Sequence, residues 1–403
     1  MNTLLHQAIC QFAGSDDLVT VAPRNGLRGG DPPTGVIVSL SPSDCTKNEL
    51  ARQGYTCARW FFVLPSLASP RWLFPLANGR CTLAGLQIYK PFARTARISK
   101  GLLTALVATR CQGFALPRLL LASRRPFPLE DLVREVTGEP QPVFSLSLGT
   151  AIRFRKLTVQ VMRPNGEIQG YIKLPLTDAA VEPVRREAEN LNHLWSFPAL
   201  RSHIPRVLYA GRWGQGYILF QSGGPRRPGP AQFSRQSEDF LQLLWAIGPT
   251  KKPGQALWEE VAARWQKAEP SLSSGWRALG QAALAKAKRE LGGLTIPCGL
   301  SHGDFVPWNT RLGGHGLYVF DWEYASFDSP ILWDVFHFKT QVGALLSKKN
   351  DLHISRDRRS GEGASFLLYL LSSACRLFGE GSPAPAGVLE LRRQLLANEL
   401  GGC

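Results

Sequence analysis

Paired cysteines and long apolar runs are both missing from this sequence. None of the eight cysteines stands in a CxxC pair and no histidine cluster accompanies them, so neither a zinc site nor a disulfide framework is predicted in a chain of 403 residues. The longest strongly apolar run, Phe366–Leu371, is too short to span a bilayer and predicts a buried helix. The N-terminal segment has neither a basic region nor a long apolar stretch, so no signal peptide is expected.

Acidic residues are also scarce, with 31 Asp and Glu against 47 Lys and Arg, for a net charge of +16. Residues 1–220 carry 26 basic and 14 acidic residues (+12), and residues 221–403 carry 21 and 17 (+4). A basic balance fits nucleic acid, an anionic membrane or an acidic substrate, and equally fits mere solubility. The 44% apolar and 19% charged content indicates a globular protein, and the length predicts two or three domains.

Residues 143–222 follow a regular order of three strands, a helix and two strands. The alternation of apolar residues and the turn signal Asn165-Gly166 support this order. The predicted strands are 143–148, 155–162, 169–174, 206–211 and 216–220, and the predicted helix is 183–195. Beyond Gly223 the pattern becomes helical, with helices expected at 238–247, at 255–291 with a break near Pro270, and from 330 onward.

Residues 1–140 carry no chemical motif and predict a small α+β domain of unknown role. The expected elements are strands at 35–40, 58–64 and 71–76 and a helix at 101–108. The polar, proline-punctuated stretch 126–142 predicts a linker to the next domain.

The segment that carries chemistry spans residues 300–325. Asp304 is followed by Asn309 five residues later and by Asp321 after a further twelve. Phosphoryl transfer needs one carboxylate to orient or deprotonate the acceptor hydroxyl, and amide and carboxylate oxygens to hold magnesium. A tight loop is expected to keep Asp304 beside Asn309, and a short hairpin to return Asp321 to the same place.

These residues resemble the aminoglycoside phosphotransferase and choline kinase superfamily, relatives of the protein kinases. The motif is present as His302-Gly303-Asp304, Asn309, Asp321-Trp322-Glu323 and, on a following helix, Asp334. The resemblance covers residues 143–345 and implies an α+β, bilobal protein-kinase-like fold, with a small antiparallel-sheet N-lobe at 143–222 and a helical C-lobe at 223–403. The N-terminal α+β domain is an addition to it. The detailed motif looks like bacterial phosphotransferases of polysaccharide and cell-envelope gene clusters.

The resemblance also implies roles for single residues. Asp304 is the expected catalytic base, and Asn309 and Asp321 are the expected magnesium ligands. His302 is expected to support the loop, Glu323 to assist either the metal or the structure, and Asp334 to tie the loop to its helix.

A second set of residues is expected to bind the nucleotide. Lys173 should reach the phosphates and pair with Glu187, with Glu189 as the other candidate. The turn that contains Ser147, Gly149 and Thr150 should cover the phosphates with backbone N–H groups. Backbone groups near Phe220 and Gln221 should face the adenine.

The expected reaction is magnesium-dependent transfer from ATP to a hydroxyl of a sugar or glycan precursor, with anionic and lipid-linked acceptors included. Aminoglycosides rank second, because a site for polycations should be rich in acids, and a choline-type acceptor stays open. Lys348-Lys349 and the stretch 356–359 lie in a polar loop that either contacts an anionic acceptor or is solvated.

The alternative of another class is a pseudokinase-like scaffold that binds glycan or lipid. No nucleic-acid partner is expected, and the expected location is cytoplasmic, either free or at the inner face of a membrane. The sequence leaves the choice between ATP and GTP and the oligomeric state open.

Overall fold

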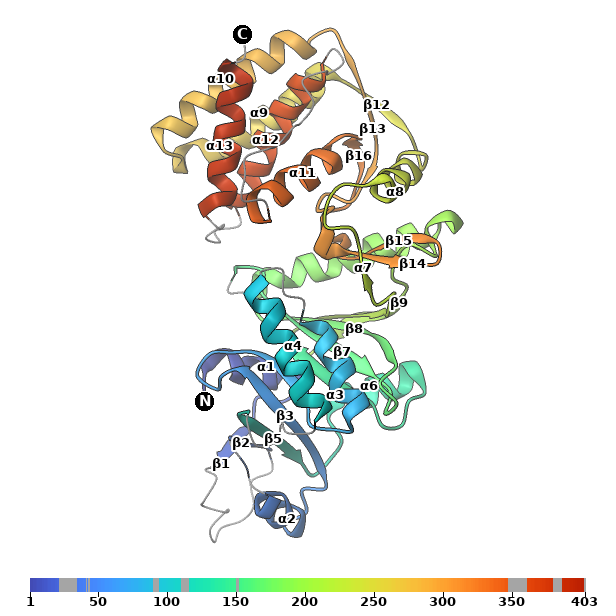
Figure 1. Cartoon of the computed structure of the whole chain (residues 1–403). Coiled ribbons are helices and arrows are strands. Elements are labelled where there is room, and N and C mark those ends of the chain that lie inside the picture. The colour runs from blue at the N-terminus through green and yellow to red at the C-terminus, as the bar shows by residue number, and fades with distance from the viewer. Residues whose placement is uncertain are drawn as a thin grey trace. The chain divides into compact units, whose positions relative to one another are not determined.

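The computed structural model describes residues 1–21, 35–40, 42, 44–89, 94–109, 116–149, 152–346, 361–379 and 386–401. The chain divides into two compact units (Figure 1). Each unit has its own hydrophobic core. The first unit comprises Met1–Ala188 and Arg206–Gly223, and the second comprises Glu189–Pro205 and Gly224–Cys403.

One sheet runs through the whole first unit and has ten strands among the described residues, in the order β1-β2-β5-β3-β4-β6-β7-β8-β10-β9. The β1–β2 pair is parallel, and the other described pairs of this sheet are antiparallel. The strands are β1 (Leu18–Val21), β2 (Val36–Leu40), β3 (Cys57–Pro65), β4 (Pro70–Pro75), β5 (Arg118–Ser123), β6 (Val143–Ser147), β7 (Lys156–Met162), β8 (Ile168–Pro175), β9 (Val207–Trp213) and β10 (Gly216–Ser222).

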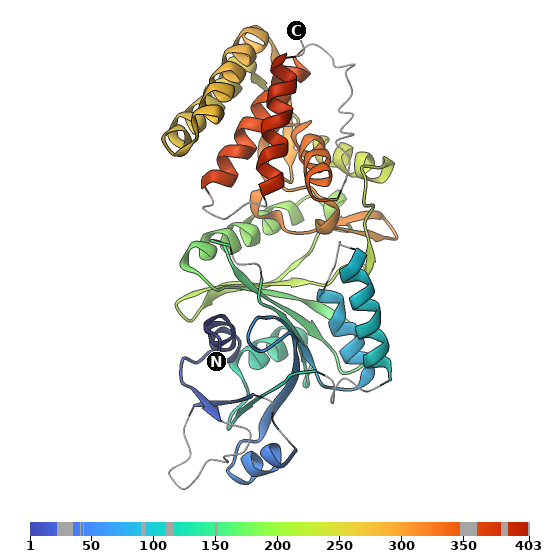
Figure 2. The same ribbon diagram turned by 60° about the vertical axis from the view of Figure 1, so that its left-hand side comes forward.

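Helices cover both faces of this sheet, and the alternation of side chains along β3 shows why. Phe61 points into the core with α1 (Thr3–Ala13) and α6 (Pro128–Thr137), whereas Phe62 points into the core with α4 (Arg94–Ala108). Figure 2 shows α1, in dark blue, and the lighter blue α3 (Gly79–Gly85) and α4 on opposite sides of the strands. The helix α2 (Asp44–Arg52) contributes Leu50 to a smaller cluster over β2 and β5.

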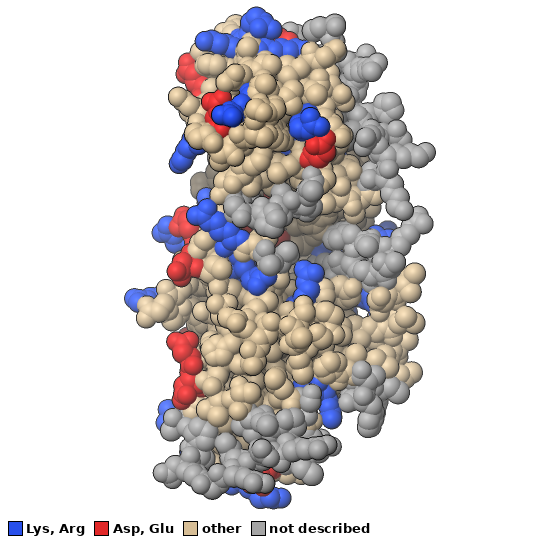
Figure 3. All heavy atoms as spheres, turned by 90° about the vertical axis from the view of Figure 1, so that its left-hand side faces the viewer, with Lys and Arg blue, Asp and Glu red and all other residues tan. Residues whose placement is uncertain are grey.

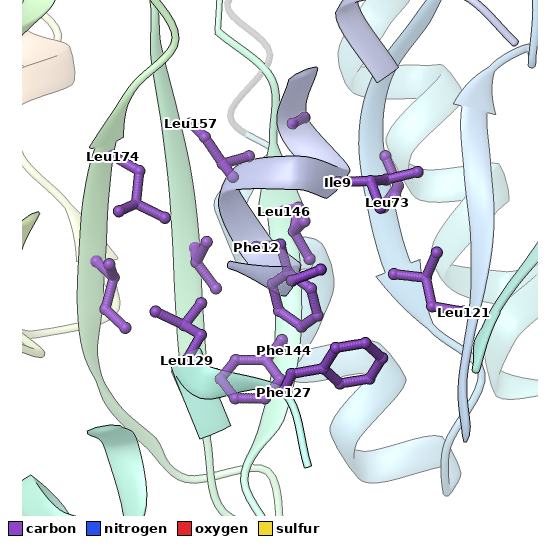
Figure 4. Close-up of a cluster of buried hydrophobic side chains, with 14 of the residues drawn as sticks. Ile9, Phe12, Leu73, Leu121, Phe127, Leu129, Phe144, Leu146, Leu157 and Leu174 are labelled. Atoms are coloured by element: carbon purple, nitrogen blue, oxygen red, sulfur yellow. The ribbon is translucent and has the colours of Figure 1, made fainter. Parts of the chain in front are cut away.

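The larger core of the first unit is centred on Phe12 of α1 (Figure 4). Its ring lies 5.5 Å from that of Phe127 and 5.3 Å from that of Phe144, between ring centroids. Leu157 of β7 and Leu174 of β8 point into the same core. Because side chains alternate along a strand, this burial directs the neighbouring Lys173 to the opposite face of the sheet.

The structure differs from the predicted division between residues 1–140 and 143–222. Strand β4 pairs with β6 in the registers Trp72↔Ser147 and Leu73↔Leu146, so the sheet continues across the predicted boundary within one compact unit.

The predicted linker at 126–142 is wrong, because this stretch forms α6. Pro128 occupies the first turn, where it needs no N–H partner, and Gly138 ends the helix with a φ of 72°. Glu130 is buried and pairs with Arg59 at 2.7 Å and with Arg134 at 3.2 Å. These start and stop signals are present in the sequence, but the prolines of this stretch were interpreted as marks of a linker.

The second unit is mainly helical, and its core gathers side chains of α9, α10, α11, α12 and α13. Its described helices are α8 (Arg235–Trp245), α9 (Gly254–Ala268), α10 (Ser274–Leu291), α11 (Trp333–Leu345), α12 (Glu362–Gly379) and α13 (Ala386–Gly401). In the described part of this unit, two three-stranded sheets complete the fold, in the orders β11-β14-β15 and β12-β13-β16. Their strands are β11 (Arg227–Pro228), β12 (Thr250–Pro253), β13 (Thr295–Ser301), β14 (Thr310–Gly313), β15 (Gly316–Val319) and β16 (Ser326–Pro330).

The predicted α+β class is confirmed, with an antiparallel-rich sheet in the first unit and helices in the second, as expected for a kinase-like chain. The predicted strands and helix of residues 143–222 all form within about three residues of their expected bounds, the helix as α7 (Val181–Trp195). No helix in the described part of the chain is long and apolar enough to cross a membrane.

Candidate active site

A loop and a hairpin bring Asp304, Asn309 and Asp321 to one end of the β14–β15 pair. The chain leaves β13, passes Asp304, and reaches Asn309 at the end of the short helix Pro307–Asn309. The hairpin register Thr310↔Val319 places Asn309 beside Phe320, whose N–H donates to the Asn309 carbonyl at 3.1 Å. The next residue is Asp321, so the local pairing produces the arrangement that the spacing predicted.

The Asp304 carboxylate is held through both of its oxygens. Asn309 Nδ2 donates to Oδ2 at 2.9 Å and to the Asp304 carbonyl at 3.0 Å. On the other oxygen, His337 Nε2 lies 2.8 Å from Oδ1, and the Arg376 guanidinium lies 3.9 Å away. Burial alone would raise the pKa of Asp304, but the His337 hydrogen bond and the positive charge of Arg376 hold this pKa well below its usual range. Asp304 is therefore an ionised carboxylate with a fixed orientation at neutral pH.

Asp334 of α11 holds the backbone of the catalytic loop. Its Oδ2 accepts the His302 N–H at 2.7 Å, and its Oδ1 accepts the Gly303 N–H at 2.9 Å. Gly303 has a φ of 75°, and a Cβ there would approach the Tyr324 carbonyl oxygen to 2.3 Å. The position therefore requires glycine for both its φ and its space.

The His302 ring lies inside the loop and is fully buried. Its Nδ1 accepts the Asp304 N–H at 3.1 Å, so its Nε2 carries the proton and donates to the Phe320 carbonyl at 3.0 Å. His302 thus links the two stretches of chain that carry Asp304 and Asp321, in agreement with the supporting role predicted for it.

Asp321 has an unusual backbone conformation. Its φ of 68° and ψ of 57° make it the one non-glycine residue with positive φ among those described. Aspartate tolerates this conformation better than most residues, and such exceptions gather at functional sites. Burial lowers the pKa of Arg311 to about 10, while the charge of Asp321 opposes that shift.

Glu323 lies half-buried in the following short helix, Trp322–Tyr324, and its metal role stays a prediction.

The oxygen donors of Asn309 and Asp321 suit a magnesium ion. Because Asn309 directs its Nδ2 toward Asp304, its amide oxygen remains available as a ligand. The described residues contain no cluster of three or more His, Cys, Asp or Glu side chains that could hold a metal. Magnesium commonly uses only one or two protein oxygens and completes its shell with water and phosphate, so two donors fit it.

Sequence reasoning missed His337 and Tyr369. His337 lies on α11 one turn after Asp334 and is buried, and its Nδ1 lies 3.1 Å from the Tyr369 hydroxyl of α12. Burial lowers the pKa of His337 to about 4, against the opposing effect of Asp304, so the ring is neutral at pH 7. Its Nε2–H then donates to Asp304 while its Nδ1 accepts from Tyr369. The i, i+3 spacing from Asp334 was the signal that could have revealed it.

Replacing His337 with alanine should lower kcat by up to about a hundredfold, because Asp304 loses a partner that fixes its orientation. Nucleotide binding should stay intact. His337→Gln should recover part of this loss, since its amide can still donate an N–H. Steady-state kinetics of both variants measure the effect. Equal kcat values for His337→Ala and the unsubstituted protein would show that the orientation of Asp304 does not depend on this ring.

In the first unit, Lys173 and Glu187 form the predicted pair. The Lys173 ammonium lies 2.6 Å from both Glu187 oxygens, and both side chains are buried. Lys173 stands in a row across the sheet, opposite Thr158 of β7 on one side and Leu219 of β10 on the other. The structure thus places Glu187, rather than Glu189, in the expected position, and contact of Lys173 with phosphate stays a prediction.

The turn predicted to cover the phosphates follows β6. Gly149 has a φ of 66°, and a Cβ there would come within 2.7 Å of the Lys156 carbonyl oxygen. Ser147 pairs with Thr158 in the sheet. Thr150 lies outside the described residues.

The predicted hinge residues lie at the end of β10. The Phe220 side chain is buried in the first unit's larger core, on the face opposite Lys173, so any contact of Phe220 with a nucleotide falls to its backbone. Gln221 is 3% exposed, and its side-chain oxygen has no hydrogen-bond partner in the described structure. Both residues lie in a bulged part of the β9–β10 pairing.

A cavity of about 810 Å³ opens within the second unit beside the catalytic loop. Its lining includes Gly303 and three side chains that surround Asp304 or its partners, namely His337, Tyr369 and Arg376. A volume of this order accommodates a small organic molecule. The cavity, whose lining includes these neighbours of Asp304 but not Asp304 itself, is therefore the candidate acceptor site.

Residues 158–338 match the model of the APH phosphotransferase enzyme family. This match supports the resemblance to the phosphotransferase superfamily over these residues, while the likeness to proteins of polysaccharide and cell-envelope gene clusters stays a prediction. No curated protein matches the chain.

Three solved structures are similar to part of this chain. The choline kinase LicA from Streptococcus pneumoniae has 16% identity and a TM-score of 0.42, with 68% of this chain and 98% of that chain covered. A thermostable mutant of aminoglycoside phosphotransferase APH(4)-Ia with ADP and hygromycin B has 13% identity and a TM-score of 0.46, with 68% and 97% covered. Wild-type aminoglycoside 2'-phosphotransferase-IIIa with GDP has 14% identity and a TM-score of 0.41, with 68% and 97% covered.

Proposed function

From the match of residues 158–338 to the phosphotransferase enzyme family, we propose that this chain transfers the γ-phosphoryl group of ATP to a hydroxyl group of a sugar or glycan precursor. The observation that carries the proposal is the Asp304 carboxylate, held on one oxygen by His337 and on the other by Asn309 beside an 810 Å³ cavity. A carboxylate fixed in this way can orient an acceptor hydroxyl for in-line attack.

Asp304 positions the hydroxyl and takes its proton late in the reaction. Its low pKa makes it a weak base toward a free alcohol, so proton transfer becomes favourable only as the new oxygen–phosphorus bond forms. The neutral His337 ring keeps its Nε2–H on Asp304 Oδ1 throughout. Magnesium, when held by Asn309 and Asp321, neutralises phosphate charge.

Lys173 and Glu187 are proposed to position the phosphates of the nucleotide. Glu187 holds the ammonium through two short contacts, and the burial of both groups fixes the lysine in one place. A fixed ammonium can stabilise charge on a phosphate without first having to be ordered.

Lys173→Met should lower kcat/KM for ATP by about a hundredfold, since a charge that stabilises the transferring phosphate is removed. It should also destabilise the fold by about 3–5 kcal/mol, because Glu187 is left as an uncompensated buried charge. The double variant Lys173→Met/Glu187→Leu should recover stability but not activity. Urea unfolding and ATP kinetics on the three proteins measure both effects, and recovery of activity in the double variant would exclude a phosphate role for Lys173.

A sugar acceptor is favoured over an aminoglycoside by the charge of residues 221–403. Residues 221–403 carry 21 basic and 17 acidic residues, a net of +4, which disfavours a polycation. On the face of the molecule in Figure 3, basic and acidic side chains are interspersed among the described residues. That distribution does not suggest a nucleic-acid surface on this face. The proposed location of the protein remains the cytoplasm, either free or at the inner face of a membrane.

The direct test is transfer of label from γ-³²P-ATP to an isolated product, across a panel of sugars, sugar phosphates, glycan precursors, choline and aminoglycosides. Labelled sugar or glycan product supports the proposal. Label on an aminoglycoside alone contradicts the acceptor class, and nucleotide binding without any transfer favours the scaffold alternative.

A further inference from the structure

The candidate acceptor cavity lies between two helices that contribute side chains at helical spacing. On α9 the residues at its wall include Glu260, Arg264 and Lys267, and on α12 they include Ser372 and Arg376. The spacing of three and four residues places each set on a single helix face. Both helices thus contribute polar side chains, beside apolar ones, to the space next to the catalytic loop.

The acidic side chains of this cavity are already paired. Glu260 and Asp328 each lie 2.8 Å from the ammonium of Lys252, which is itself only 12% exposed. Asp334 uses its two oxygens to accept the backbone N–H groups of the catalytic loop. The acids that line the cavity therefore have partners and offer little net attraction to a cationic ligand.

The cations that follow Glu260 on the same face of α9 are not matched by acids. Arg264 donates to the Ser372 hydroxyl at 3.2 Å, and neither Arg264 nor Lys267 has a carboxylate partner among the described residues. Arg376, across the cavity, is engaged with the catalytic loop through the Gly303 carbonyl at 2.8 Å. Positive charge is thus left uncompensated on the α9 wall of the cavity, whose lining also includes Gly303 of the catalytic loop and the Asp304 partners His337 and Arg376.

We propose that the acceptor carries an anionic group, a phosphate monoester or a carboxylate, which Arg264 and Lys267 bind while its hydroxyl lies at Asp304. The inference rests on the proposed function and narrows its substrate class. A guanidinium presents paired N–H groups that match the oxygens of phosphate and carboxylate. The same unmatched charges repel polycations such as aminoglycosides. Lys348-Lys349 and the stretch 356–359, which the sequence left open as an acceptor contact or a solvated loop, lie outside the described residues.

One arm of the test compares acceptors that differ mainly in charge. ADP release from Mg·ATP is measured with glucose, glucose 6-phosphate, glucuronic acid and glucosamine. The proteins are the unsubstituted chain, Arg264→Met/Lys267→Met, and the control Arg289→Met, which changes an exposed cation of α10 that is not part of the cavity lining. We expect the anionic sugars to be preferred in kcat/KM by about tenfold or more, and the preference to vanish in the double variant only.

A second arm is independent of turnover. Phenylglyoxal modifies accessible arginines, and inorganic phosphate should protect Arg264 but not Arg289 within the same molecule, as read by peptide mass spectrometry. Equal protection of both arginines, a preference for glucose or glucosamine, or a preference for anionic sugars that survives in the double variant would overturn the inference. Absence of ADP with every acceptor would count against the proposed function, while the protection of Arg264 would still decide whether the cavity binds anions.

Discussion

Asp304→Asn is expected to reduce transfer by about 10²–10⁴-fold, the range that a positioned general base contributes. The change removes the charge that orients the acceptor hydroxyl and accepts its proton, but keeps the size of the side chain. Nucleotide affinity should change little, because Asp304 is proposed to contact the acceptor rather than the phosphates. Turnover measured with an identified acceptor, alongside calorimetric ATP titration, separates the two effects.

The matched control for this change is Asp239→Asn. Asp239 is an exposed carboxylate of α8 in the same unit, outside the cavity lining, and lies 4.0 Å from Arg235. This variant should keep unchanged turnover. If Asp304→Asn also kept near-normal turnover, the assignment of Asp304 as the catalytic carboxylate would be wrong.

Asp321→Asn is expected to weaken magnesium-dependent nucleotide binding by at least about tenfold, since changes around metal ligands commonly cost that much. Asparagine is the informative replacement because it tolerates the positive φ of position 321, whereas alanine would add backbone strain. The effect should therefore report the lost carboxylate and not a distorted loop.

Calorimetric titration of ATP with and without magnesium measures this second effect. In the unsubstituted protein, magnesium should strengthen nucleotide binding, and in Asp321→Asn this gain should shrink while binding without magnesium stays unchanged. If magnesium strengthened nucleotide binding by Asp321→Asn as much as by the unsubstituted protein, the ion would have ligands other than Asp321.

The core of the candidate site could be predicted because its geometry is local in sequence. Asp304, Asn309 and Asp321 are brought together by one loop and one hairpin, and the hairpin register follows from a short turn between β14 and β15. The Lys173–Glu187 pair was also within reach, because a strand and the next helix position it. Their roles in binding nucleotide and metal remain predictions.

The parts that were missed depend on contacts that are distant in sequence. His337 and Tyr369 meet only because α11 and α12 bring them together, and no pattern around Tyr369 indicates that pairing. The continuity of the sheet likewise depends on the pairing of β4 with β6 through Trp72↔Ser147. The residues of either strand alone do not identify the strand with which it pairs. Strand pairing is set by packing against neighbours rather than by the residues of one strand.

The measurement that tests the central claim most directly is acceptor-dependent ADP release from Mg·ATP by the unsubstituted chain and by Asp304→Asn, with γ-labelled product isolated from the same reactions. We predict that the unsubstituted chain releases ADP and forms labelled product in equal amounts with an anionic sugar, and that Asp304→Asn binds ATP but forms almost none. Equal product from both proteins, or nucleotide binding without acceptor-dependent ADP from either, would contradict a phosphotransferase centred on Asp304.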